Sequence, residues 1–407
     1  MLQLRPILST LRRHRTAALL IVFEIALTCA IVCNAVFLIA NRIERLRFDD
    51  GLADNELVVL GTHSIGDNPN AAADTREDLA ALRAIPGVSA AVMMTGLPFT
   101  ESQNMSGVNL KPDQEVPTLT TAMVGAPAGL PGALGLRLVA GRDFRSDEVL
   151  DAEHVNQSNF AFPGCLVTKA MAERLFPGEP AVGKSIYVFG DQPLRILGVV
   201  DRLASTRPDH GDPSDLYSLI LPISDTFDDG VYVLRTDPGE RERVIKAGVA
   251  ALERVNPHRV GQGHRTLEDM RGEFYASDRA MVWLLAGVCV ALLVVTAFGI
   301  VGLASFWVQQ RTRMIGTRRA LGATRGQILR YFQAENLLLT SAGIGLGMLL
   351  AFAINQWLMT QYELPRLPVL VLPLGACVLW VLGQLAVLAP ARRAAALPPA
   401  HAMRGLA

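Results

Sequence analysis

Four long, uncharged apolar stretches dominate the pattern of the chain. They cover residues 17–40, 280–310, 336–362 and 367–391, and the only charged residue inside them is Glu24. A helix that crosses a bilayer needs about 20 mostly apolar residues, whereas apolar runs of about 10–14 are typical of buried helices in soluble proteins. The pattern therefore predicts an α-helical membrane protein with four transmembrane helices, one near the N-terminus and three in the C-terminal part.

The short segments beside these stretches predict the orientation. They are rich in arginine before the first stretch, between the second and third, and after the fourth: Arg5, Arg12, Arg13 and Arg15; Arg311, Arg313, Arg318, Arg319, Arg325 and Arg330; Arg392, Arg393 and Arg404. Because positively charged short loops stay in the cytoplasm, both termini are predicted to be cytoplasmic and residues 41–279 external. The first stretch continues into the charged run 41–47, which favours a retained anchor over a cleaved signal peptide.

The external segment alternates strand and helix patterns at both of its ends. The expected elements are a strand at 56–60, a helix at 74–85 and a strand at 88–95, then a strand at 231–235, a helix at 239–255 and a strand at 259–265. Two separated βαβ halves predict a split α+β sandwich. Between them we expect an inserted β-rich lobe at about 117–213, with a helix at 168–176 and strands at 185–189 and 194–200.

These elements define the expected domains. They are a cytoplasmic segment, first helix and stalk (1–48), an external core domain (49–266), a second stalk with three transmembrane helices (267–391) and a cytoplasmic tail (392–407). A basic cytoplasmic loop (309–334) joins the second and third transmembrane helices.

Composition excludes several classes of protein. The 407 residues carry 38 basic and 38 acidic side chains and are 50% hydrophobic, which argues against disorder and against a nucleic-acid-binding protein. Four of the five cysteines lie in the apolar stretches, so Cys165 alone cannot build a disulfide framework. No Cys/His spacing is typical of a zinc site, and no catalytic residues or metal ligands are predicted.

One motif imitates a nucleotide-binding loop. Residues 178–185, from Gly178 to Ser185, fit the pattern GxxxxGK[ST]. A true phosphate loop follows a strand and opens a helix. Here a helix is predicted before the motif and a strand after it, and Pro180 removes one backbone N–H. We therefore interpret it as a turn, and expect neither a cofactor in this chain nor an autonomous nucleotide hydrolase.

Several stretches together resemble the MacB/FtsX-type permeases of ABC transporters. The basic loop, 311–325 followed by 327–335, is similar to the cytoplasmic loop signature of this family. The similarity extends to 136–144 and 167–184 in the external domain, and to 390–394 with Met403-Arg404 in the tail. The resemblance covers nearly the whole chain.

The resemblance implies a MacB-type periplasmic core domain with a porter-like sandwich and an inserted second lobe. It also implies an FtsX-like transmembrane domain and a location in the bacterial inner membrane. It implies a permease subunit that works in a dimer and transmits motion driven by a separate dimer of ATPase subunits, which bind ATP and Mg²⁺, for efflux or export. A periplasmic adaptor and an outer-membrane channel are further candidate partners. The alternative is an FtsX-like signalling scaffold that activates a periplasmic partner without transport. Met314 departs from the family, where an acid is common, so a heterodimer with a related permease stays open beside a homodimer.

The basic loop is the predicted ATPase-coupling site. Its apolar residues Ile315, Leu321 and Ile328 are expected to enter a groove of the partner, ringed by arginines, with Gly316 and Gly322 marking helix ends. The loop residues assigned to this role are Arg311, Arg313, Ile315, Gly316, Arg318, Arg319, Leu321, Gly322 and Arg325.

Two groups of residues are singled out within the membrane. Glu24 is a costly ionisable group in the first helix, and Thr28, one turn later, is expected to hydrogen-bond to it. In the third helix the small residues Ser341, Gly343, Gly345 and Gly347 allow close helix packing, either within one subunit or between two.

Overall fold

The computed structural model describes residues 15–66, 68–100, 104–112, 114–151, 161–208, 213–226, 228, 230–362 and 371–396. They form two compact units. We call Met1–Ile43 with Ser277–Ala407 the bundle, and Glu44–Ala276 the core domain. Each unit is described by itself.

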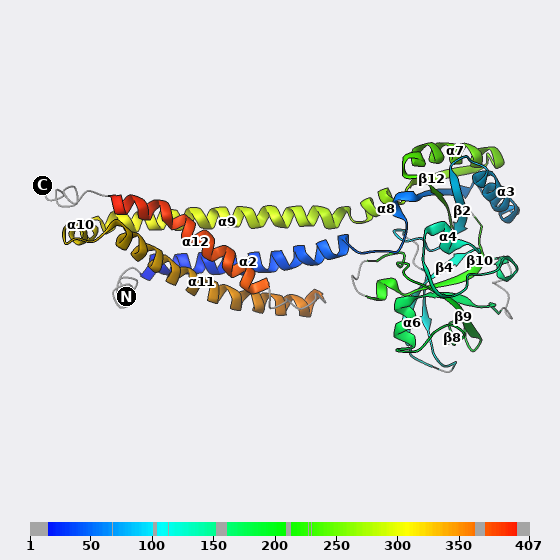
Figure 1. Cartoon of the computed structure of the whole chain (residues 1–407), viewed down its shortest axis with the longest axis horizontal. Coiled ribbons are helices and arrows are strands. Elements are labelled where there is room, and N and C mark those ends of the chain that lie inside the picture. The colour runs from blue at the N-terminus through cyan, green and yellow to red at the C-terminus, as the bar shows by residue number, and fades with distance from the viewer. Residues whose placement is uncertain are drawn as a thin grey trace. The chain divides into compact units, whose positions relative to one another are not determined.

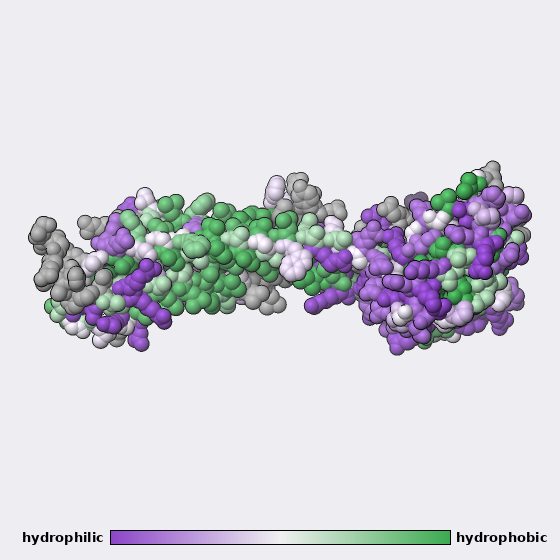
Figure 2. Space-filling model, turned by 90° about the horizontal axis from the view of Figure 1, so that it is seen from above, coloured by the Kyte–Doolittle hydropathy of each residue, from purple (hydrophilic) through white to green (hydrophobic). Residues whose placement is uncertain are grey.

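Four long helices make up most of the bundle (Figure 1). They are α2 (Arg15–Leu46), α9 (Ala276–Gln310), α11 (Arg325–Tyr362) and α12 (Val371–Ala396), and the short helix α10 (Thr312–Ala320) connects α9 to α11. All four are long and apolar enough to cross a membrane, which confirms the four predicted spans. Hydrophobic residues cover most of the length of this unit (Figure 2). Large side chains such as Trp283, which is 79% exposed, face outward as expected for a surface in contact with lipid.

The first layer of the core domain is an antiparallel four-stranded sheet. Its strands are β1 (Leu57–Ser64), β2 (Val88–Met94), β11 (Val231–Thr236) and β12 (Arg259–Thr266), in the order β12-β1-β11-β2. Helix α3 (Ala71–Arg83) joins β1 to β2, and α7 (Arg241–Val255) joins β11 to β12. This is the predicted split α+β arrangement, assembled from both ends of the external segment.

Both faces of this sheet are buried. Val58 and Leu60 on β1 pack into a core with α3 and α7, whereas Leu57 and Val59 face the opposite side, as the two-residue period of a strand requires. Gly248 brings α7 close to the sheet, because a Cβ there would lie 2.5 Å from Cδ1 of Leu60.

A second, eight-stranded sheet packs against the other face. Its main path is β3 (Met105–Val108), β4 (Leu119–Ala126), β10 (Ser218–Ser224), β7 (Cys165–Thr168), β9 (Pro193–Val200) and β5 (Leu138–Gly141). Strand β6 (Leu150–Asp151) pairs with β10, and β8 (Ser185–Tyr187) pairs with β9. The helix α6 (Lys169–Leu175) covers a separate apolar core on this sheet.

This lobe is wider than the predicted 117–213. Strands β3 and β10 lie outside those bounds, and β10 is central because it pairs with both β4 and β7. The sequence pattern does not show this pairing, because β10 reads as an isolated apolar run after Pro213.

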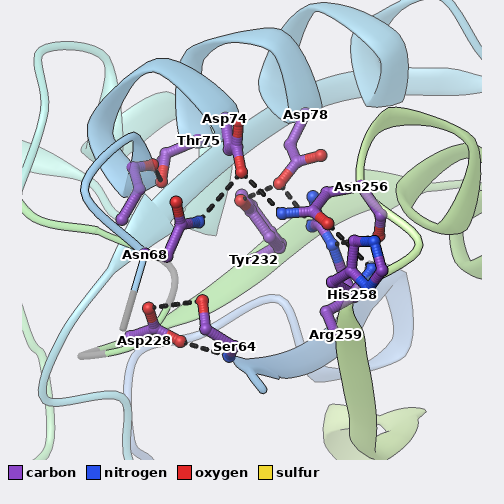
Figure 3. A network of polar contacts seen from close by, with 11 residues as sticks. Ser64, Asn68, Asp74, Thr75, Asp78, Asp228, Tyr232, Asn256, His258 and Arg259 are labelled. Carbon is purple, nitrogen blue, oxygen red and sulfur yellow. Dashed lines mark hydrogen bonds and ion pairs between the residues drawn. The ribbon is translucent and has the colours of Figure 1, made fainter. Parts of the chain in front are cut away.

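A buried polar network ties α3 to two strands of the first sheet (Figure 3). The guanidinium of Arg259 on β12 lies 2.6 Å from Oδ2 of Asp78 on α3, and the hydroxyl of Tyr232 donates to the same oxygen at 2.5 Å. Both members of the ion pair are almost fully buried, with side chains 2% and 0% exposed. Burial raises the pKa of Asp78, while the hydrogen bonds from Arg259 and Tyr232 oppose that shift. Nearby, Asp74 accepts hydrogen bonds from two asparagine side chains, those of Asn68 and Asn256.

Arg271 lies on helix α8 (Leu267–Phe274) and binds the segment that follows α2. Its guanidinium donates to Oδ2 of Asp54 at 2.5 Å and to the carbonyl of Phe48 at 2.5 Å, and lies 3.5 Å from Oδ2 of Asp50. The same segment also contacts the chain just after β9 of the second sheet, where the N–H of Ala204 donates to the carbonyl of Asp50 at 3.0 Å. We call residues 48–54 with Arg271 the clasp.

The clasp predicts a pH dependence. Burial, with a smaller effect from Asp54, raises the pKa of Asp50 to about 6. The folded chain therefore binds this proton more tightly than the unfolded chain, and stability of the order of 2–3 kcal/mol is lost as the pH rises from about 4 to about 6. The variant Asp50→Asn keeps an acceptor for the N–H of Leu52 and should remove this contribution.

Thermal unfolding of the purified full chain between pH 4 and pH 8 would measure this effect. Asp191→Asn is the matched control, since Asp191 is an exposed turn residue before β9 and lies outside the clasp. An Asp50→Asn curve with the same pH slope as the wild type would show that Asp50 does not titrate as proposed.

Candidate functional site: the α10 turn of the bundle

The α10 turn comprises residues 311–327, and its ends are fixed by local hydrogen bonds. After α10 the chain reverses at Gly322, whose φ of 94° is strained for any residue with a Cβ. The next helix begins with a capping box: Thr324 N–H donates to Oε1 of Gln327 at 2.9 Å, and Gln327 N–H donates to Oγ1 of Thr324 at 3.3 Å. Gly322 therefore marks a helix end, whereas Gly316 lies inside α10, contrary to prediction.

A buried ion pair joins the start of the turn to α11. Nη1 of Arg311 lies 2.9 and 2.7 Å from the two carboxylate oxygens of Glu335. The side chains are only 7% and 2% exposed, and the guanidinium also lies over the ring of Trp307, 5.5 Å from its centroid. Arg311 was predicted to ring a partner groove. The structure instead uses it inside the bundle, because a buried carboxylate needs a charged partner.

The apolar residues of the turn face inward. Ile315 and Ile328 are 2% and 5% exposed, and they pack with Phe332 in a small core. The C-terminal part of α12 completes this core with Ala391, Ala394 and Ala395. The prediction that Ile315 and Ile328 enter a partner groove is therefore wrong, since their own chain covers them.

Two further arginines hold α10 in place. Arg319 donates from Nη1 to the carbonyl of Ala395 at 3.1 Å, which satisfies a carbonyl in the last turn of α12. The guanidinium of Arg318 lies 5.0 Å from the ring centroid of Tyr331 on α11, but Arg318 stays exposed. Helix α10 is thus fastened to α11 and α12 as well as to α9.

One large apolar side chain of the α10 turn, that of Leu321, is exposed, and arginine side chains lie near it in sequence. Leu321 is 83% exposed, more than any other large apolar side chain among the described residues. Arg318 and Arg325, three and four residues away, are also exposed. Met314 is half-buried on α10, and the Arg313 side chain lies outside the described part of the chain. The candidate docking surface is therefore smaller than predicted and centred on Leu321.

The intramembrane polar residues pack α2 on α9. The carboxylate of Glu24 rests on Gly299, where a Cβ would lie 2.4 Å from Oε1. One turn further, Oγ1 of Thr28 lies 2.8 Å from Oγ1 of Thr296, and both residues are buried. The expected bond between Thr28 and Glu24 is replaced by this contact, because antiparallel α9 offers a hydroxyl at that level. Arg42 and Asp278 form an ion pair between the same two helices.

The glycines of α11 bring it against α2 within one chain. A Cβ on Gly343 would lie 2.8 Å from Cβ of Ile25, and one on Gly347 would lie 2.5 Å from Cβ of Cys29. Gly345 has no neighbour within 4 Å, and Ser341 accepts a hydrogen bond from Nε1 of Trp380 on α12 at 3.1 Å. Of the two alternatives for this stripe, packing within one subunit accounts for Gly343 and Gly347.

Sequence reasoning missed two parts of the site. It gave Glu335 no role, although a lone acid after six arginines indicates a pairing partner. The contribution of α12 carried no such signal, since three alanines and a backbone carbonyl have no distinctive pattern.

Fold and site together define a membrane protein with four apolar helices, an α+β core domain between the first and second helices, and a basic helical turn between the second and third. The MacB-like periplasmic core domain model matches residues 24–252, which are 229 of the 407 residues. The FtsX-like permease C-terminal model matches residues 286–399. The chain belongs to the MacB/FtsX-type family of ABC transporter permeases.

Individual proteins are similar to this chain. The uncharacterized ABC transporter permease YknZ of Bacillus subtilis (strain 168) is 26% identical over 358 residues, 84% of this chain and 82% of that protein. The macrolide export ATP-binding/permease protein MacB of Chromobacterium violaceum is 27% identical over 283 residues, 66% of this chain but only 41% of that protein. The crystal structure of the extracellular domain of YknZ covers 51% of this chain and all of that domain, with 16% identity and a TM-score of 0.32.

Proposed function

We propose that this chain is the permease subunit of an ABC transporter in the bacterial inner membrane, with both termini in the cytoplasm. In this proposal a separate dimer of ATPase subunits binds ATP and Mg²⁺ and docks on the α10 turn. The resulting motion is transmitted to the core domain on the periplasmic side, where it drives efflux or export. The permease works as a pair, with a second copy or with a related permease.

The observation that carries the proposal is the construction of the α10 turn. It is fastened to α11 by the buried pair Arg311–Glu335 and to α12 by Arg319, and its apolar underside is packed. It nevertheless presents Leu321, 83% exposed, beside Arg318 and Arg325. An apolar centre surrounded by a polar rim is the common arrangement of a protein–protein interface, and arginine is enriched in such interfaces. Binding of the ATPase at Leu321 would therefore move α10 together with the adjoining ends of α11 and α12.

The bundle offers a route for that motion. Helices α2 and α9 immediately precede and follow the core domain in sequence. The Thr28–Thr296 contact and the Arg42–Asp278 ion pair tie these two helices to one another. Rigid-body movement of packed helices is a common way to transmit a conformational change.

We assign the ATP site to a partner, because the motif that imitates a nucleotide-binding loop lacks the surroundings of a true one. Residues 178–185 form a turn between α6 and β8, so a helix precedes the motif and a strand follows it. This is the reverse of a phosphate loop. A periplasmic adaptor and an outer-membrane channel would extend the assembly across the periplasm if it exports a substrate. One relative is named a macrolide export ATP-binding/permease protein. The signalling alternative shares the α10 turn and differs only in what the core domain does.

The docking role is tested by Leu321→Asp combined with Arg318→Glu. We expect the ATPase that copurifies with the full chain in mild detergent to be reduced at least tenfold, because the variant places charge where a hydrophobic contact is made. Arg319 is left unchanged, since it holds Ala395.

Ile65→Asp is the matched control, because Ile65 is a 65% exposed apolar residue of the core domain. It should retain the ATPase at the wild-type level. Full copurification by a Leu321→Asp/Arg318→Glu variant that unfolds like the wild type would refute docking at the α10 turn.

A further inference from the structure

Two sequence stretches singled out above, 136–144 and 167–184, meet in the second sheet of the core domain. They supply most of the wall of an open hollow of about 620 Å³. Ala140 on β5 lines one side, and Ala172, Phe176 and Ala181, on and after α6, line the other. Val199 on β9 forms part of the wall. The α10 turn and its proposed function involve none of these residues.

The hollow lies beside an open strand edge. Strand β5 is the last strand of its sheet and pairs only with β9 among the described residues. All four of its residues are exposed, Leu138 by 37% and Val139 by 47%. The carbonyl of Arg137 accepts from Asp201 on the β9 side at 2.8 Å, so the next residue, Leu138, directs its backbone N–H and C=O away from β9. Natural sheet edges are usually protected by charge, proline, a covering element, short length or a β-bulge. Strand β5 has no charge or proline within it, but it is four residues long and its register with β9 shifts between Leu138 and Ala140, so the free pairing groups are those beside that irregularity, at Leu138.

The charges around the edge are neutralised in pairs. Arg137 is paired with Asp201 at 2.7 Å and Arg142 with Glu148 at 2.5 Å, at the two ends of β5. On the rim of the hollow, Lys169 lies 3.8 Å from Glu173, and Lys184 is paired with Glu179. This surface therefore complements an uncharged segment rather than a strongly acidic or basic one. An extended backbone can pair with the outward N–H and C=O groups of Leu138.

We propose that the β5 edge binds an extended, uncharged polypeptide segment of a partner protein as an added strand. The backbone of that segment pairs with β5, and one of its apolar side chains enters the hollow between β5 and α6. This is β-strand addition, in which main-chain hydrogen bonds give affinity and a side-chain pocket gives specificity. The proposal is independent of ATPase docking, because it uses only residues of the core domain.

A defined peptide probe tests the proposal on the full chain in nanodiscs. The probe is a C-amidated hexapeptide of alternating valine and threonine whose N-terminal amine is acylated by carboxyfluorescein, and binding is followed by fluorescence anisotropy. We expect saturable binding and at least tenfold weaker binding by Leu138→Lys, which places an unpaired charge on the edge. Met105→Lys is the matched control, because Met105 is 48% exposed on β3 at the opposite edge of the same sheet.

Two further measurements keep the outcome decisive. A peptide of the same sequence with alternate backbone amides N-methylated cannot pair along an edge, and should not bind. Amide hydrogen exchange at residues 138–141 should slow when the unmodified peptide is bound, which reports on the wild-type chain without any substitution. Absence of saturable binding, equal binding of the methylated peptide, or a Met105→Lys loss equal to that of Leu138→Lys would overturn the proposal.

Discussion

Replacing Glu335 with alanine should lower the unfolding free energy of the bundle by about 3–5 kcal/mol, because it leaves the buried guanidinium of Arg311 without its counter-charge. The pair is 7% and 2% exposed, so water cannot take the place of the carboxylate. The measurement is an SDS-unfolding titration of the purified full chain in mixed micelles. Since the pair also fastens the α10 turn to α11, ATPase copurification should fall with stability.

A rescue variant separates charge from packing in this prediction. Arg311→Leu with Glu335→Leu removes both charges and should recover most of the stability, because an apolar pair of similar size often replaces a buried ion pair without loss. Arg330→Ala, at an exposed site on α11, should unfold like the wild type. A Glu335→Ala loss no larger than that of Arg330→Ala would contradict the account of the pair.

Replacing Arg259 with alanine should destabilise the core domain by a similar amount, about 3–5 kcal/mol. The substitution leaves Asp78 fully buried, with the Tyr232 hydroxyl still donating to its carboxylate, and it removes the ion pair that joins β12 to α3. Thermal unfolding of the full chain, followed by hydrogen exchange of peptides from α3 and β12, would measure both effects.

The control for Arg259 lies on the same strand. Arg265 is 39% exposed in its ion pair with Glu273, which is 72% exposed, and surface pairs of this kind contribute about 0–1 kcal/mol. Arg265→Ala should therefore have little effect. If the two variants unfolded alike, the buried network would not hold α3 to the sheet.

The sequence predicts the helices and strands of this fold better than it predicts which strands pair with one another. The four spans follow from the length of uncharged apolar runs, and β1, α3 and β2 follow from periodicity and a Pro-Gly stop. The split sheet is predictable because β11, α7 and β12 repeat the same pattern. The extent of the inserted lobe along the chain is not predictable, because the parallel pairing of β10 with β4 joins segments almost 100 residues apart and no local sequence pattern indicates it.

The candidate site shows the same limit. A cluster of arginines with apolar residues at helical spacing identifies the α10 turn, but does not say which side faces inward. The inward side is decided by Ala391, Ala394 and Ala395, far along the chain and small enough for Ile315 and Ile328 to pack against them. Of three apolar residues predicted to meet a partner, the fold leaves only Leu321 exposed. Thr28 is likewise paired by a residue on another helix, Thr296, which no local pattern indicates.

Hydrogen exchange of the core domain in two nucleotide states tests the central claim most directly. The full chain and the ATPase that copurifies with it are placed in nanodiscs, with ATP under non-hydrolysing conditions or without nucleotide. The account predicts a nucleotide-dependent change in exchange in the wild type at residues 48–54 of the clasp and along α8, which carries Arg271. It predicts no such change in Leu321→Asp/Arg318→Glu. Identical exchange of the core domain in both states, with the ATPase bound, would contradict transmission through this chain.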